Sequence, residues 1–270
     1  MKKNLAKLLF LSLLPISLSS CNGIKGDTLG YFDYGIYPQS LITSTEIIND
    51  LNNLTECDEY GFYHYKGNLF MPEIAHPLND GMKFNDPERR IVEGEKYWFK
   101  VEPVTWDIIQ IVDNLYFVTS DIILDCDYFS NNLLTYKDSH IRETIDYTIY
   151  DRLFSDKEYE ISDTIVEYAS FEESDPLNAV DKLFMLSYVD LSNSSLGFNA
   201  DNRRIKVSDY ALCKGADHRY WTRSQAEVKD NTNYIYAVDD SGAFVTVDSK
   251  EKLGMRLAFK VETSPLVSEV

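Results

Sequence analysis

The sequence predicts an α+β protein: a single irregular domain with a mostly antiparallel sheet and a few short helices. Three dense β-forming runs occupy the middle of the chain, and further runs close it, whereas helical spacing is confined to short segments. The central runs lie at residues 96–102, 105–112 and 115–123, and the later ones at 219–223, 232–238, 243–247 and 255–261. With 270 residues, 44% of them hydrophobic, the chain is too apolar for disorder and long enough for one large domain or two small ones. We favour one, over residues 29–265.

Turn-forming residues separate the other predicted strands. An aromatic run at 29–41 indicates a strand, and residues 61–71 indicate a hairpin that turns at Lys66-Gly67-Asn68. Asp113-Asn114 predicts a tight turn between the second and third central runs. Residues 71–94 contain three prolines and several charges and predict a loop, and the apolar run at 180–189 predicts a buried strand.

Capping residues mark the predicted helices. Thr43 and Glu46 form a capping-box pattern before a short amphipathic segment. Residues 157–168 have a weaker helical pattern, and Ser208 with Gly215 brackets one short helical turn. Asp138 or Ser139 can cap a longer helix, which we expect to lie across the sheet. Its apolar residues recur every four positions, at Ile141, Ile145, Ile149 and Leu153.

The start of the chain has the pattern of a bacterial lipoprotein signal peptide over residues 1–20. Lysines at positions 2, 3 and 7 precede an apolar run at 8–18, and Leu18-Ser19-Ser20-Cys21 matches a lipidation box. The apolar run is shorter than the roughly 20 residues that span a bilayer. We therefore expect Cys21 to carry the lipid, residues 21–28 to form a tether, and the domain to lie outside the cytoplasm, at the bacterial cell membrane or surface. The alternative is an ordinary secretory peptide cut near Ser19 or Ser20.

Charge and cysteine content restrict the partners. Removal of residues 1–20 takes away three lysines and changes the formal net charge from −18 to about −21. This charge argues against nucleic acid as a partner, because nucleic-acid affinity comes largely from Lys and Arg. Membrane attachment would depend on the acyl chains, in which each buried CH₂ contributes about 0.8 kcal/mol of binding free energy. Scattered histidines and the three cysteines beyond Cys21, at positions 57, 126 and 213, predict no metal site or cofactor and at most one disulfide.

Six short segments, in order along the chain, carry a family resemblance. They are Tyr37-Pro38-Gln39, residues 98–103 with Trp106, Ser139-His140-Ile141-Arg142, residues 181–187, Trp221-Thr222-Arg223-Ser224, and Gly254-Met255-Arg256. Together they resemble an uncharacterised domain family of secreted and lipid-anchored bacterial proteins, domain of unknown function 6273. The resemblance runs from about residue 30 to 261 and implies no activity.

A more distant similarity links the end of the chain to the sulfatase-modifying-factor branch of the C-type-lectin-like fold. It implies a C-type-lectin-like architecture but no function. The copper-dependent oxidases of that branch need two cysteines near the end of the domain, where this chain has only Cys213. The chain also departs from its family at Glu143-Thr144-Ile145, where relatives carry Trp-Leu-Asn, and at Leu257, where they carry proline.

Trp221 and Arg223 are the candidate ligand-binding residues. They alternate on one predicted strand and so share a face, where a ring beside a guanidinium could bind a sugar or a carboxylate. The structural alternative places the ring in the core and the arginine on a buried acid or on carbonyls. The carboxylates Asp121, Asp125 and Asp127 offer a weaker cation site, since no calcium-loop motif accompanies them.

Two hypotheses for the function follow. The first is a membrane-anchored binding or scaffold module that recognises a glycan, a peptide or an envelope partner. The second is a cell-envelope hydrolase that uses paired carboxylates as acid and base, although no catalytic motif locates them. We favour the first, and the sequence assigns no catalytic residue.

Overall fold

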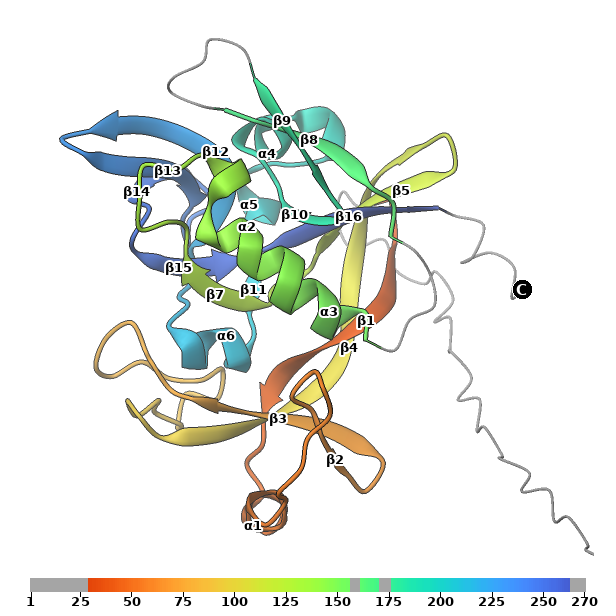
Figure 1. Cartoon of the computed structure of the whole chain (residues 1–270), viewed down its shortest axis with the longest axis vertical. Coiled ribbons are helices and arrows are strands. Elements are labelled where there is room, and N and C mark those ends of the chain that lie inside the picture. The colour runs from red at the N-terminus through yellow and green to blue at the C-terminus, as the bar shows by residue number, and fades with distance from the viewer. Residues whose placement is uncertain (1–28, 156–160, 170–175, 263–270) are drawn as a thin grey trace, which may run out of the picture.

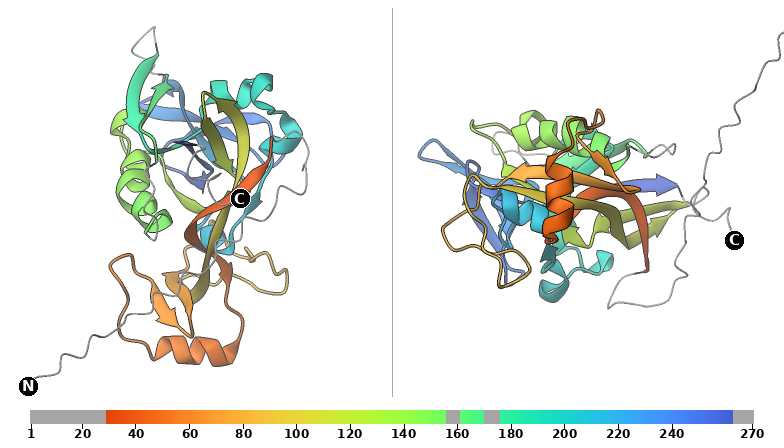
Figure 2. Two further views of the ribbon diagram at one scale, coloured as in Figure 1. Left: turned by 90° about the vertical axis from the view of Figure 1, so that its right-hand side faces the viewer. Right: turned by 90° about the horizontal axis from the view of Figure 1, so that it is seen from below.

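The computed structural model describes residues 29–155, 161–169 and 176–262. The predicted signal peptide, Cys21 and the tether lie outside the described residues, as does the end of the predicted domain beyond residue 262. Within them the fold is α+β, with mostly antiparallel sheets and a few short helices, as predicted. Figures 1 and 2 show the strands gathered in one body, with α1, β2 and β3 projecting at its lower end.

A seven-stranded sheet forms the larger layer. Its order is β10-β16-β5-β4-β3-β2, and β1 pairs with β4 beside that path, all antiparallel. The strands are β1 (Tyr31–Leu41), β2 (Tyr63–Tyr65), β3 (Asn68–Ile74), β4 (Lys96–Val112), β5 (Leu115–Ser120), β10 (Leu183–Met185) and β16 (Leu257–Glu262).

A five-stranded sheet of order β14-β13-β12-β15-β7 packs beside it. Two small sheets complete the fold: a parallel pair of β6 with β11 and an antiparallel pair of β8 with β9. The strands are β6 (Ile122–Ile123), β7 (Asp125–Tyr128), β8 (Thr164–Tyr168), β9 (Leu177–Asp181), β11 (Lys206–Val207), β12 (Tyr220–Lys229), β13 (Thr232–Val238), β14 (Phe244–Asp248) and β15 (Lys252–Met255).

The strand β4 unites two predicted runs, at 96–102 and 105–112, into 17 residues. Proline at position 103 does not interrupt it, although proline cannot donate to a ladder. On one side β3 pairs with β4 only up to Lys100, and β5 begins pairing at Trp106, so residue 103 lies in the gap between them. Gln39 Nε2 donates to the carbonyl of Pro103 at 3.0 Å from the other side. Because neither β3 nor β5 pairs with β4 at residue 103, the absence of an N–H on Pro103 leaves no carbonyl of these strands without its donor.

The helices are short and mostly capped by serine or asparagine. Ser44, rather than the predicted Thr43, caps α1, and Ser139 caps α2. Ser208 and Gly215 bound α6 as predicted. The α-helices are α1 (Thr45–Asn52), α2 (His140–Thr144), α3 (Tyr150–Leu153), α4 (Tyr188–Ser192), α5 (Ala200–Arg203) and α6 (Asp209–Lys214); η1 (Tyr136–Asp138) and η3 (Ser194–Leu196) are 3₁₀ turns, and η2 (Ile145–Ile149) is a π-helical turn.

The π turn explains the four-residue apolar spacing between α2 and α3. In an α-helix of 3.6 residues per turn, each four-residue step leaves about 40° of surplus rotation, so three steps would move the stripe by about 120°. Tyr150 N–H donates to Ile145 O, an i→i+5 bond that absorbs this surplus. As a result all four residues of the stripe, from Ile141 to Leu153, are fully buried. The continuous helix crosses the body and contacts β1, β7 and β10 (Figure 1).

Two of the predicted segments differ from the structure in their secondary structure. The segment 157–168 was predicted as a helix, but residues 164–168 form β8, because Thr164, Val166 and Tyr168 alternate inward with period two. Residues 156–160 are outside the described chain. The predicted strand at 180–189 is divided instead into the end of β9, all of β10 and the start of α4, where Ser187 and Asp190 form a capping box.

Tryptophans mark the two apolar cores. Trp106 is fully buried in the large core, where its Nε1 donates to Tyr34 O at 2.7 Å and its ring meets Phe259 edge-on at 4.6 Å. A smaller cluster under α1 contains Leu51, Phe70 and Trp98. Because β4 contributes to both cores, the projecting end is continuous with the body.

Candidate functional site

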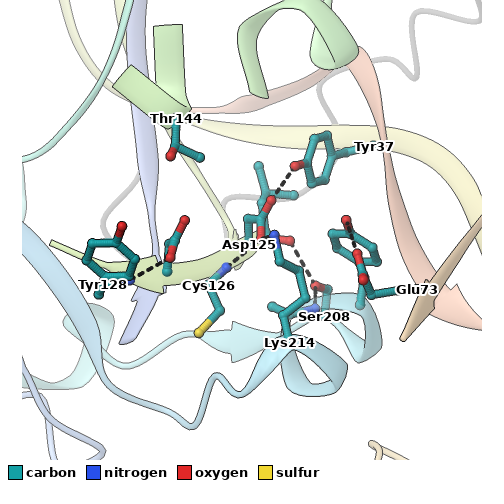
Figure 3. Close-up of polar contacts among 12 residues, drawn as sticks. Tyr37, Glu73, Asp125, Cys126, Tyr128, Thr144, Ser208 and Lys214 are labelled. Atoms are coloured by element: carbon teal, nitrogen blue, oxygen red, sulfur yellow. Dashed lines mark hydrogen bonds and ion pairs between the residues drawn. The ribbon is translucent and has the colours of Figure 1, made fainter. Parts of the chain in front are cut away.

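Asp125, at the start of β7, is an almost fully enclosed carboxylate. Its side chain is 1% exposed and has a partner on each oxygen (Figure 3). Lys214 Nζ lies 2.5 Å from Oδ1, and Tyr37 Oη donates to Oδ2 at 2.5 Å. These three residues come from β7, α6 and β1, so one carboxylate joins a helix to both large sheets.

Local sequence fixes Lys214 in this position. Ser208 Oγ accepts from Ala211 N at the start of α6 and donates to Leu124 O, beside Asp125. Gly215 ends the helix at φ 108°, a conformation that favours glycine, and a Cβ there would lie 2.7 Å from His76 O. The six-residue helix is thereby held at both ends, with its last side chain directed at Asp125.

Electrostatics make this cluster an ion pair rather than a reactive lysine. Burial alone would lower the pKa of Lys214, but the adjacent Asp125 carboxylate and Tyr37 outweigh it, and that pKa lies above its usual range. Burial, followed by the charge of Asp125, raises the pKa of Tyr37 well above its usual range. Lys214 is therefore a cation and Tyr37 a neutral donor at neutral pH, which does not suit nucleophilic or general-base chemistry.

Next to this cluster, His140 joins the start of α2 to β7. Its Nε2 lies 3.0 Å from Asp127 Oδ2 and 3.3 Å from Thr144 Oγ1, and its ring stacks on Tyr128 at 4.2 Å. In a catalytic triad the hydroxyl and the carboxylate contact different ring nitrogens. Here both contact the same nitrogen, so the Thr-His-Asp grouping anchors the helix and lacks the geometry of a triad.

A third polar cluster brings two carboxylates onto one arginine. Arg142 donates to Asp181 Oδ1 from Nε at 2.8 Å and from Nη2 at 2.6 Å, and the same Nη2 lies 3.6 Å from Asp146 Oδ2. Burial raises the pKa of Asp146 to about 6; Arg142 opposes this, and the charge of Asp181 adds to it. Among the residues that the structure describes, the buried side-chain atoms without a hydrogen-bond partner are Tyr136 Oη and Asp181 Oδ2.

Asp146 and Asp181 are two neighbouring carboxylates, as the hydrolase hypothesis requires. However, the side chain of Asp181 is 0% exposed, whereas that of Asp146 is 30% exposed. Only Asp146 can therefore meet a substrate directly.

Trp221 and Arg223, the predicted ligand-binding residues, do not form an accessible platform. Trp221 is fully buried and its Nε1 donates to Asp127 O at 3.0 Å. Arg223 is 5% exposed; it donates to Glu167 O at 2.8 Å and to Met185 O at 2.7 Å, and pairs with Asp190 at 2.8 Å. The physical reason is that β12 is an inner strand of its sheet, flanked by β13 and β15, so both side chains are enclosed by neighbouring elements. This corrects the expectation of a ring and a guanidinium facing a ligand.

The carboxylates considered for a cation are likewise engaged within the protein. Asp125 has Lys214 and Asp127 has His140, as described above. In the described parts of the chain, no group of three or more His, Cys, Asp or Glu side chains is arranged to hold a metal ion. The three described cysteines are free thiols, with Cys57 exposed and Cys126 and Cys213 buried. Burial raises the pKa of Cys213 to about 12, so this thiol is unreactive at neutral pH.

The segments that carry the family resemblance turn out to hold the fold together. Arg142 binds Asp181, Arg223 binds the carbonyl of Met185, and Arg256 donates to Ser120 O at 3.2 Å and to Asn202 O at 3.3 Å. Gly254 is packed so closely that a Cβ would lie 2.4 Å from Ile123 Cγ2. The three arginines thus bind carbonyl or carboxylate groups that are distant in the sequence.

A family model described as Domain of unknown function (DUF6273) matches residues 113–263, just over half of the 270-residue chain. The chain belongs to this family. The match begins at the β4–β5 turn and contains four of the six resemblance segments, from Ser139 onwards. Neither the curated proteins nor the solved structures include a match to the chain, so the C-type-lectin-like architecture stays a prediction. No helix among the described residues is long and apolar enough to cross a membrane.

Sequence reasoning did not find Lys214 or Tyr37 as partners of Asp125. The one available signal was the pair of capping residues, Ser208 and Gly215, around α6. They predicted the helix but not that its last residue, Lys214, pairs with Asp125. Tyr37 and Asp125 are 88 residues apart, and no local pattern joins them.

We expect the Asp125→Asn substitution to destabilise the protein by about 3 kcal/mol, because it leaves the buried Lys214 without its counter-charge. Urea unfolding at pH 7 measures the effect. Asp80→Asn is the control: Asp80 pairs with Arg90 at 4.0 Å on the surface, where exposed pairs contribute at most about 1 kcal/mol. Equal effects of the two substitutions would contradict a special role for Asp125.

The raised pKa of Asp146 predicts a pH-dependent component of stability. Between about pH 4, the usual aspartate pKa, and pH 6, the folded state holds a proton that the unfolded state releases. The free energy of unfolding should therefore fall as pH rises through this window, by about 1–2 kcal/mol more in the wild type than in Asp146→Asn. Urea unfolding of both proteins at intervals from pH 4 to 7 tests this; parallel profiles would refute it.

Proposed function

We propose that this chain is a membrane-anchored extracytoplasmic lipoprotein that acts as a binding or scaffold module for a glycan, a peptide or an envelope partner. The anchor is lipidated Cys21, proposed from the sequence pattern before it. The binding role is proposed from the outer face of the β8–β9 pair.

One observation carries the binding role. Ile165 and Val180 are direct cross-strand partners, and they are 70% and 58% exposed. An exposed apolar cross-strand pair costs solvation free energy unless a partner covers it. This chemistry favours a peptide or protein segment with apolar side chains.

Two arginines hold this face in place from behind. Arg142 Nη2 donates to Val180 O at 3.3 Å, and Arg223 Nε donates to Glu167 O at 2.8 Å. Within the described chain, β8 and β9 pair only with each other, so these side chains connect them to the body. A preformed surface loses less conformational entropy on binding than a flexible loop. Arg223 would thus position the binding face without touching the ligand.

The enclosed charges support binding over catalysis. Asp125, Asp181 and Asp190 each pair with a cation of the same domain. A carboxylate held in such a pair serves the fold, whereas acid–base catalysis needs a carboxylate that can reach a substrate.

The alternative is a cell-envelope hydrolase, and Asp146 is the specific observation in its favour. This side chain is partly exposed and its pKa is raised to about 6, a value that suits a general acid. The charge of its buried neighbour Asp181 would help to keep Asp146 protonated. This alternative predicts that the protein cleaves an envelope polymer and that Asp146→Asn abolishes the cleavage.

The anchor has a direct test. Mass spectrometry of the membrane fraction should find a diacylglyceryl-modified peptide that begins at Cys21, and Cys21→Ser should release the protein or leave its precursor uncut. A mature terminus without lipid would refute the anchor while leaving the binding role open to its own test.

The binding face is tested with the mature chain in a screen of glycans, peptides and envelope fragments. We expect Ile165→Ser with Val180→Ser to weaken binding at least tenfold, about 1.4 kcal/mol, because it removes the apolar contact. The control is Val92→Ser with Val189→Ser, two other exposed valines. Equal binding by both double variants would contradict the proposed face, and unchanged circular dichroism would show that each variant is folded.

A further inference from the structure

The strand register fixes the place where the chain enters the domain. The start of β1 pairs with the far end of β4, with Tyr31 opposite Asp107. Just before it, Leu29 N donates to Ile108 O at 3.1 Å. From Ile108, β4 runs on to Val112 and the β4–β5 turn. The chain therefore enters beside this hairpin, at the right of Figure 1 and facing the viewer in the left view of Figure 2.

Exposed aliphatic side chains gather at the same place. Leu29 is 63% exposed, Ile111 50% and Val112 49%. The end of β16 also lies here, with Glu262 opposite Leu115. We call residue 29, residues 110–117 and Lys260 the hairpin end.

A hollow of about 180 Å³ opens at the hairpin end. It contains one cation and one acid: Lys260, whose Nζ lies 5.3 Å from the centre of the Phe117 ring, and Asp113 in the turn. A zwitterionic phospholipid headgroup offers the complementary charges, with a phosphate for the lysine and an ammonium group for the aspartate. The lining residues are Gln110, Val112, Asp113, Leu115, Phe117 and Lys260.

The length of the tether limits how far this end can lie from an anchor. Seven residues separate Cys21 from Leu29, and at about 3.3–3.6 Å per residue they reach no more than about 30 Å. Val112 lies four residues along β4 from Ile108, which is about 13 Å at the usual rise of a strand. A bilayer that holds the lipid of Cys21 is thus within reach of the exposed aliphatic residues.

We propose that the hairpin end lies on the surface of a phospholipid bilayer, with Ile111, Val112 and Leu29 at headgroup level and a zwitterionic headgroup in the hollow. The inference rests on the proposed lipoprotein anchor for its orientation. The mature net charge of about −21 opposes an anionic surface, which favours zwitterionic lipid as the partner. The apolar contact would add to the acyl chains and orient the domain.

Quenching by brominated lipid tests the orientation. The mature chain with Val112→Trp is attached through an amino-terminal histidine tag to nickel-chelating lipid in phosphatidylcholine vesicles brominated near the headgroup. This attachment makes the result independent of acylation in the cell. The matched control is Val189→Trp, since Val189 is 70% exposed on α4. Its neighbour Tyr188 packs on β13 and β14, on the other side of the body in Figure 1. The three native tryptophans are buried and provide a common background.

We expect bromine to quench the tryptophan at position 112 several-fold more strongly than the one at position 189. Equal quenching at the two positions would overturn the proposal, even if mass spectrometry had established the anchor. An unmodified Cys21 would instead refute the anchor and leave this result valid. Lys260→Glu, added to Val112→Trp, should reduce the quenching at least twofold; unchanged quenching would remove the headgroup from the proposal.

Discussion

The contact of Asp125 with Tyr37 and Lys214 is the constraint on which the two large sheets depend. A buried carboxylate costs several kcal/mol unless a cation and a donor accompany it. Here the carboxylate belongs to the five-stranded sheet, the donor to the seven-stranded sheet and the cation to α6. The interior can therefore close only when three distant parts of the chain arrive together. This requirement favours one arrangement of the sheets over others with similar apolar burial.

The same principle governs the arginines. Arg142 and Arg223 reach carbonyl groups of β9 and β10, with which their own elements share no ladder, and Arg256 reaches the carbonyl of Ser120 at the end of the β5–β16 ladder. In a fold with several small sheets, many carbonyls lie at sheet edges, and a guanidinium with five N–H donors can satisfy more than one of them. The family segments are thus explained as parts of the framework. The family model covers residues 113–263, and the resemblance segments within that range are framework residues.

Local features of the fold could be predicted from the sequence, and distant ones could not. Ser139 and the apolar stripe from Ile141 to Leu153 predicted a helix because both signals act within a few residues. Asp113 and Asn114 predicted a turn, and both adopt positive φ there. The strand at 164–168 was predicted as helix because its apolar alternation covers only five residues. Such a short alternation is a weak signal within a longer polar segment. Trp221 and Arg223 share an enclosed environment, but their spacing alone could not distinguish the interior from a ligand face, since burial depends on the strands that flank β12.

The π turn at Ile145–Ile149 has a consequence for how the family can vary in length. Such a turn is equivalent to an α-helix that has received one additional residue. A relative that lacks one residue here would form regular α-helix and keep both the Ser139 cap and the buried leucine at its far end in place. Loss of a single residue, which would shift every later contact in a strand, would therefore be absorbed at this point without changing how the helix docks on the body.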